Sequence, residues 1–164
     1  MPHQPVIDGF EFASAGAIQQ GVWPLKDFQR LRDMLASEAG EVTYGVQGTR
    51  DERGRPALRV KVEGTLQLRC QRCLEPLPFE VKVEDLLVLA ATLSEIHAEP
   101  ADAYAPDRIV AGKEMPVREL IEDELILALP YAPRHEGCAP GAAAREERGN
   151  SPFASLRGLM RDKH

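Results

Sequence analysis

The sequence predicts an α+β fold in which an antiparallel β meander packs against two helices and a flexible C-terminal tail follows. Three patterns support this class: a helical spacing of apolar residues at 24–37, alternating apolar and polar residues across 41–91, and a second helical pattern at 116–129. The 164 residues suit a single domain over 1–138, then a linker at 139–151 and a short helical segment at 152–164.

The first predicted helix covers residues 24–37. Pro24 stands at a favourable first helical position, and Gly40 follows as a stop signal. Between them, apolar side chains recur every three or four residues, namely Leu25, Phe28, Leu31, Met34 and Leu35.

The meander is predicted from residues that alternate along three strands. A short strand contains Val42, Tyr44 and Val46, and the turn-rich sequence TRDERGRP follows it. The next strand is the clearest, because one parity is apolar at Leu58, Val60, Val62, Leu66, Leu68 and Cys70 while the other parity is polar. Gly64 interrupts the apolar parity, which predicts a bulge or bend. Phe79, Val81 and Val83 then predict an antiparallel return strand.

Residues 92–112 have weak periodicity and two prolines, so we expect a loop with a short strand at Arg108–Ala111. The helical pattern at 116–129 lies between Pro116 and Pro130. Its apolar stripe consists of Val117, Leu120, Ile121, Leu125, Ala128 and Leu129, while Glu119, Glu122 and Asp123 lie away from the stripe. Phe153 and Leu156 share one side of the last helical segment, where they would dock on the core or on a partner.

The composition narrows the class of protein. The sequence has neither a secretory N-terminal pattern nor a run of about 20 apolar residues, so we expect a cytoplasmic protein without a membrane span. The net charge of −6 argues against a uniformly basic nucleic-acid binder. However, residues 50–83 carry eight basic and five acidic side chains, whereas residues 84–136 carry four basic and twelve acidic ones. The basic segment permits a local phosphate contact, but these counts favour the simpler interpretation of ordinary solvated charge.

Cys70 and Cys73 form a Cys-x-x-Cys pair at the end of a predicted strand. A redox pair of the thioredoxin type needs a helix directly after the first cysteine, and Glu75 and two prolines disfavour one here. A turn between strands is a natural shape for half of a structural zinc site, and His135 and Cys138 would complete a Cys3His set. The remaining alternative is that the cysteines are packed structural thiols.

No motif of a catalytic site is present: the sequence has no phosphate-binding glycine loop, no nucleophile elbow and no His-Glu-x-x-His. We therefore expect a binding protein without enzymatic activity and without a small-molecule substrate. Residues 122–124 could hold a cation, but consecutive helical residues diverge, and a solvated acidic face is the simpler interpretation. Candidate RNA contacts are Arg59, Lys61, Arg69 and Arg72, without interleaved aromatic residues for base stacking.

Three segments, in this order, resemble the YceD family of bacterial large ribosomal RNA subunit accumulation proteins. They are LRCQRCLEPL, then VRELIEDELILALPYAPRH with Cys138 close behind, and NSPFASLRGL. The resemblance covers nearly the whole chain. It implies a cytoplasmic, non-enzymatic factor needed for the synthesis, processing or stability of 23S ribosomal RNA, with ribosomal RNA or pre-ribosomal large-subunit components as partners.

The resemblance also implies a zinc site in some branches of the family, where a cysteine-rich cluster follows the acidic helix. This chain keeps only His135 and Cys138 at that place. A second hypothesis is a protein-interaction adapter, in which Glu119, Glu122 and Asp123 contact a basic ribosomal protein or a nuclease and RNA is not touched.

Overall fold

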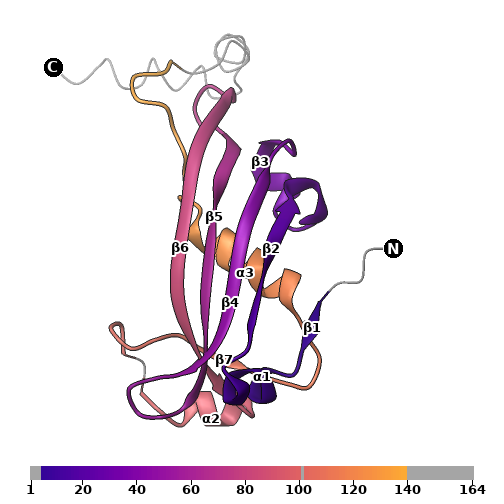
Figure 1. Cartoon of the computed structure of the whole chain (residues 1–164). Coiled ribbons are helices and arrows are strands. Elements are labelled where there is room, and N and C mark those ends of the chain that lie inside the picture. Colours follow the sequence, from indigo (N-terminus) through magenta and orange to yellow (C-terminus); the bar gives the residue numbers. More distant parts are fainter. Residues whose placement is uncertain (1–4, 101, 140–164) are drawn as a thin grey trace, which may run out of the picture.

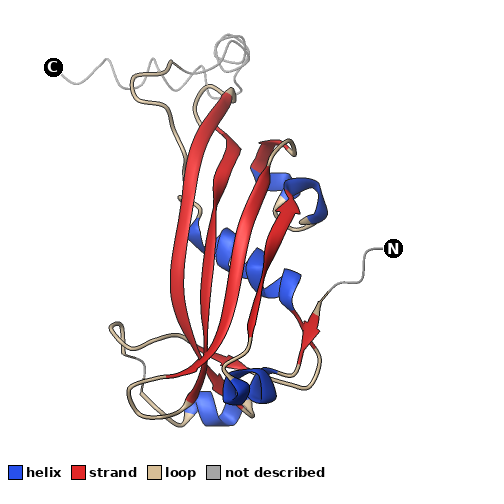
Figure 2. Ribbon diagram, in the orientation of Figure 1, coloured by secondary structure: helices blue, strands red, loops and turns tan. Residues whose placement is uncertain are grey.

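The computed structural model describes residues 5–100 and 102–139 and confirms the α+β class (Figures 1 and 2). A mixed sheet has the strand order β2-β4-β5-β6-β7, and β3 pairs with β5 beyond the end of β4. The strands of this sheet are β2 (Ile18–Pro24), β3 (Leu35–Ser37), β4 (Glu41–Arg50), β5 (Pro56–Arg69), β6 (Pro76–Ala90) and β7 (Arg108–Val110). A separate pair joins β1 (Val6–Ile7) to β8 (Met115–Pro116), and the α-helices are α1 (Gly9–Ala15), α2 (Leu93–His97) and α3 (Val117–Ala128).

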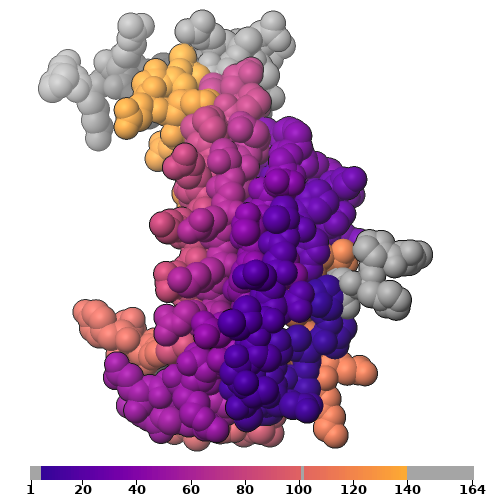
Figure 3. All heavy atoms as spheres, in the orientation of Figure 1, coloured from indigo at the N-terminus to yellow at the C-terminus, as the bar shows by residue number. Residues whose placement is uncertain are grey.

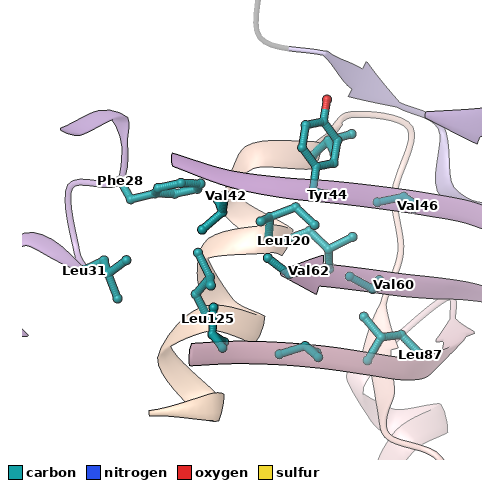
Figure 4. Packing of buried hydrophobic residues seen from close by; sticks show 14 of the residues in the cluster. Phe28, Leu31, Val42, Tyr44, Val46, Val60, Val62, Leu87, Leu120 and Leu125 are labelled. Carbon is teal, nitrogen blue, oxygen red and sulfur yellow. The ribbon is translucent and has the colours of Figure 1, made fainter. Parts of the chain in front are cut away.

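The predicted meander is confirmed as β4, β5 and β6, which pair antiparallel in sequence order. Its apolar parity faces α3, which crosses the inner face of the three strands (Figure 4). Val60 and Val62 of β5 and Leu125 of α3 are fully buried in this layer. The 14 residues of β5 span roughly 45 Å at the rise of an antiparallel strand, so the molecule is elongated along the β5–β6 hairpin (Figure 3).

The sequence predicts a bulge or bend at Gly64; the structure has no bulge there, and the glycine has another role. The pairing register is continuous through this residue, which lies opposite Val42 of β4 and Val81 of β6. A Cβ atom at Gly64 would lie 2.7 Å from Val42 Cγ1 and 3.0 Å from the Glu41 carbonyl oxygen. Glycine is therefore required because the neighbouring strand approaches closely, and the break in apolar parity does not mark a break in the strand.

The predicted helix at 24–37 is wrong. These residues end β2, make two short 3₁₀ turns at Leu25–Asp27 and Arg32–Met34, and then form β3. The apolar pattern did identify core side chains, since Leu25, Phe28 and Leu31 are fully buried. Figure 4 shows Phe28 and Leu31 within this core. A spacing of three and four residues also fits a segment of successive tight turns, so the pattern alone does not require an α-helix.

Tertiary hydrogen bonds explain why no helix forms there. The Glu122 carboxylate of α3 accepts from the backbone N–H of Arg30 at 2.6 Å and from that of Leu31 at 3.2 Å. The Arg30 guanidinium adds a bond to Glu122 at 3.1 Å, one to Asp123 at 2.6 Å and one to the Glu119 carbonyl at 3.2 Å. A side chain 92 residues away thus satisfies donors that a helix would have paired locally.

Glu122 itself is only 6% exposed, which differs from the expectation that it lies on a solvated face of the helix. The predicted helix at 116–129 is otherwise confirmed as α3.

The segment 92–112 is more ordered than predicted. The expected short strand is confirmed as β7, which pairs parallel with β6. The helix α2 was missed, although the sequence carries its signal: the Thr92 hydroxyl accepts from the Glu95 N–H at 3.2 Å, and the Glu95 carboxylate accepts from the Ala91 N–H at 2.9 Å. Thr-x-x-Glu is the sequence pattern of a reciprocal helix cap.

Of the linker predicted at 139–151, residues 140–151 lie outside the described residues, as does the whole helical segment predicted at 152–164. Within the residues that the structure describes, no helix is long and apolar enough to cross a bilayer.

We predict that Glu122→Ala lowers the free energy of unfolding by about 3 kcal/mol, because two backbone donors lose their acceptor inside the protein. The measurement is urea unfolding followed by circular dichroism. Glu119→Ala, on the exposed face of the same helix, is the control and should change the free energy by less than about 0.5 kcal/mol. Equal small losses in both variants would show that Glu122 is an ordinary surface residue.

A second acid of α3 makes stability depend on pH. Glu124 is 6% exposed, and burial followed by the nearby charge of Asp85 raises its pKa from 4.5 to about 7. The folded chain therefore holds this proton more tightly than the unfolded chain.

The free energy of unfolding should consequently fall as the pH rises from about 4.5 to about 7, on the order of 2 kcal/mol from this group. Glu124→Gln removes the titration, so we expect this variant to be more stable than the parent at pH 8 and equal to it below pH 4.5. Urea unfolding at both pH values tests this, with Glu119→Gln as the exposed control. An unchanged pH profile in Glu124→Gln would refute the assignment.

Candidate metal centre

Two segments that are distant in sequence meet at the turn of the β5–β6 hairpin. Cys70 follows β5 and opens this turn, where its N–H donates to the Glu75 carbonyl at 3.0 Å. The chain after α3 runs back along the sheet to the same end (Figure 1). It is attached there by a hydrogen bond of 2.8 Å from the Gln71 N–H to the Pro133 carbonyl.

This arrangement brings together all four residues that the sequence proposed as metal ligands. The Cys70 and Cys138 sulfur atoms are 3.6 Å apart, and Cys73 Sγ lies 3.3 Å from His135 Nδ1. One ligand atom from each residue lies within 4.8 Å of the other three. A tetrahedron with metal–sulfur bonds of about 2.3 Å has edges of about 3.8 Å, so this Cys3His cluster has the dimensions of one metal site.

The second nitrogen of His135 strengthens this interpretation. His135 Nε2 lies 3.0 Å from the carbonyl oxygen of Pro76, the first residue of β6. Because the carbonyl can only accept, Nε2 carries a proton, and Nδ1 is the ring nitrogen placed beside Cys73 where a metal would bind. Metal-binding histidines typically have such a carbonyl partner behind the ligating atom.

The turn also prepares Cys70 as a thiolate. Cys70 is fully buried, and burial alone raises a thiol pKa. Against that burial, the backbone N–H groups of Cys73, His135 and Arg72 hydrogen-bond the sulfur and lower the pKa of Cys70 to about 5. Burial and the neighbouring sulfurs of Cys70 and Cys73 raise the pKa of Cys138 instead.

Leu74 supplies the backbone geometry of this turn. It has a φ of +67°, in the left-handed region that glycine usually occupies. The sequence lacks a glycine after Cys73, and the structure shows that the turn forms with leucine in this conformation.

The geometry separates the three interpretations of the Cys-x-x-Cys pair. Within residues 5–100 and 102–139, no helix begins after Cys70 until α2, so the dipole that activates a thioredoxin-type cysteine is missing. A set of packed thiols explains Cys70 but not the half-exposed Cys73 and Cys138, whose sulfurs point at the same centre. The cluster is compatible with a structural metal.

The four RNA-contact candidates fall into two pairs. Arg59 and Lys61 lie on the exposed face of the sheet, and both pair with Glu84, at 3.6 and 3.1 Å. Arg69 and Arg72 are exposed beside the Cys3His cluster, and among the described residues neither side chain makes an ion pair. The structure adds Arg134, which sequence reasoning missed because it is 62 residues from Arg72 and adjoins His135.

The partner-docking candidates differ in their exposure to solvent. Glu119 and Asp123 are exposed on α3, although Asp123 already pairs with Arg30, and the buried Glu122 is unavailable to a partner. Phe153 and Leu156 lie outside the described residues.

The fold and the cluster together define an α+β protein whose long hairpin meets the segment after its covering helix at a Cys3His cluster. A family model described as "Large ribosomal RNA subunit accumulation protein YceD" matches residues 58–160, which include all four cluster residues. The chain belongs to the YceD family, as its sequence motifs predicted.

A curated relative from Haemophilus influenzae (strain ATCC 51907 / DSM 11121 / KW20 / Rd) carries the same description. It is 25% identical over 127 residues, which cover 77% of this chain and 72% of the relative. No solved structure matches the chain significantly.

Proposed function

We propose that this protein is a non-enzymatic ribosome-biogenesis factor of the cytoplasm that supports the synthesis, processing or stability of 23S ribosomal RNA. Membership of the YceD family is the observation that carries the proposal. The partners would be ribosomal RNA or other components of the pre-ribosomal large subunit.

In this proposal the Cys3His cluster binds one structural zinc ion. Three thiolates and an imidazole are a common ligand set of closed, tetrahedral zinc sites. The ion would hold the segment 133–138 on the turn of the hairpin, since Cys70 and Cys73 belong to one segment and His135 and Cys138 to the other.

We also propose that this end of the hairpin contacts RNA phosphates. Arg69, Arg72 and Arg134 are exposed there and make no ion pair with a described residue. Arg59 and Lys61 are weaker candidates, because Glu84 offsets their charge across the strands and would repel a phosphate. The cluster would act by keeping the arginines in one arrangement.

We predict one zinc per chain in protein purified without an affinity tag or chelator, measured by mass spectrometry. Cys70→Ser, Cys138→Ser and His135→Gln should each lose the metal, because each removes one of four ligands. Chelation should also lower the melting temperature of the parent by about 5–10 °C, because the metal links two segments of the folded chain.

The matched control for the zinc experiment is His97→Gln, which replaces an exposed histidine outside the cluster and should retain the metal. A parent protein without metal, or variants that all retain it, would refute the zinc assignment. The proposed RNA function would stand independently of that result.

For RNA, we predict that Arg69→Glu combined with Arg72→Glu weakens binding to 23S ribosomal RNA fragments by roughly tenfold or more at 100 mM salt. Fluorescence anisotropy over a salt series measures the affinity, and the salt dependence should become shallower as phosphate contacts are lost. The same variant should fail to restore the ratio of 23S to 16S ribosomal RNA in cells that lack the protein.

The control is Arg59→Gln combined with Lys61→Gln, which should bind as the parent does. If the parent restores 23S ribosomal RNA in cells but binds no RNA, the adapter hypothesis replaces direct binding. In that case a pull-down would survive ribonuclease and would depend on Glu119 and Asp123. If cells without the protein accumulate normal 23S ribosomal RNA, the proposed function is wrong.

A further inference from the structure

A cleft lies at the end of the molecule opposite the Cys3His cluster. It is formed by the turn between β4 and β5, the end of α2 with the residues after it, and the segment that leads into β7 (Figure 1). Its volume is about 750 Å³, which is within the range of pockets that bind small ligands. The lining residues used below are Arg53, Arg55, Glu99, Asp102, Asp107 and Arg108.

Three guanidinium groups converge on one carboxylate in this cleft, which we call the arginine cleft. Arg55 Nη1 lies 3.3 and 3.2 Å from the two oxygens of Glu99. Arg108 Nη1 lies 3.3 Å, and Arg53 Nη1 3.8 Å, from Glu99 Oε2. A single negative charge therefore occupies a position that three positive charges share.

The other partners of these arginines balance their charge but leave guanidinium N–H donors unused. Arg55 also pairs with Asp51 at 2.7 Å, and Arg108 also pairs with Glu95 at 3.6 Å. Arg53 is different, because its side chain pairs only with Glu99 within the part of the chain that the structure describes. The Glu99 carboxylate is thus surrounded by more N–H donors than its two oxygens can satisfy, and a group with more acceptor oxygens would suit this position.

Arg108 provides independent evidence that the Glu99 carboxylate does not supply an acceptor for every arginine donor of the cleft. Its side chain is only 12% exposed, and its Nε is buried without a hydrogen-bond partner among the described residues. Buried donors are nearly always paired, so an unpaired guanidinium nitrogen beside a cleft indicates a missing acceptor. A phosphate has more acceptor oxygens than a carboxylate and suits the planar fork of arginine.

We propose that the arginine cleft binds one phosphate group of a nucleotide, which displaces the Glu99 carboxylate. Asp102 and Asp107 also line the cleft, so it is not a continuous basic track for a long phosphate backbone. Because these acidic residues would repel neighbouring phosphates, we infer a site for one phosphate only. The inference that the bound phosphate belongs to ribosomal RNA rests on the proposed function. The inference that the cleft binds a phosphate does not.

The experiment measures binding to the full-length protein by fluorescence anisotropy and calorimetry. The probes are uridine 5′-monophosphate, a 5′-phosphorylated single-stranded RNA decamer and the same decamer with a 5′-hydroxyl. Tighter binding of the phosphorylated decamer than of the 5′-hydroxyl decamer would identify a terminal phosphate as the group bound, and equal binding an internal phosphodiester. Binding of the mononucleotide alone would identify a free nucleotide as the source.

We expect Arg53→Gln to weaken binding of the phosphate probe roughly tenfold, because a charge-assisted contact is lost. Glu99→Gln should strengthen binding severalfold, because the competing negative charge is removed. The Arg53 side chain is 72% exposed, so its replacement should leave the fold intact. Arg32→Gln is the matched control, because Arg32 is also an exposed arginine with one carboxylate partner, Glu38, and lies outside the cleft.

If no probe binds, or if neither variant changes the affinity, the cleft is only a structural ion-pair network and the proposal is overturned. A purely structural network would instead show a lower melting temperature in both variants. Measuring 23S ribosomal RNA in cells with the same variants separates the two proposals. If deleting the protein lowers 23S ribosomal RNA but the cleft binds no phosphate probe, only this site is refuted. If the cleft binds the probe but deleting the protein leaves 23S ribosomal RNA unchanged, only the proposed function is refuted.

Discussion

The structure depends on the packing of α3 across the inner face of β4, β5 and β6. The alternating apolar residues of three long strands leave one wide face that must be covered, and the apolar stripe of α3 covers it (Figure 4). The buried Glu122 carboxylate then holds the turns around Arg30 against this helix. Because α3 crosses the sheet, the chain that leaves it is directed to the turn of the hairpin, where His135 and Cys138 meet Cys70 and Cys73.

The long β5–β6 hairpin separates two chemically different ends. The Cys3His cluster lies at one turn with Arg69, Arg72 and Arg134, which make no ion pair with a described residue, and the arginine cleft lies near the other end of β5. Between them, the exposed face of the sheet carries alternating charges that pair across the strands, such as Lys61 with Glu84. Charges on this face pair across the strands, and we propose the two ends of the hairpin as the places that bind partners.

The candidate metal site could be predicted from the sequence because it consists of residue types with few alternative roles. Two cysteines at a turn and a nearby histidine and cysteine indicated one ligand set, and the chain path brings the four together. The His135 contact with Pro76 and the proximity of Arg134 could not be predicted, since neither follows from spacing along the chain. The arginine cleft was missed because Arg53, Glu99 and Arg108 belong to three separate segments.

The sequence by itself determined the α+β class, the strands at 41–91, the helix at 116–129 and the family, because these depend on local periodicity and on short motifs. Tertiary structure alone decided the conformation of residues 24–37, where the apolar spacing fits both a helix and a series of turns. The physical reason is that a backbone N–H group donates to whichever acceptor is available. At Arg30 and Leu31 the carboxylate of Glu122 takes the place of the carbonyl groups of a helix. The same long-range contact made Glu122 a buried structural residue, although its place on the helix had suggested a solvated face.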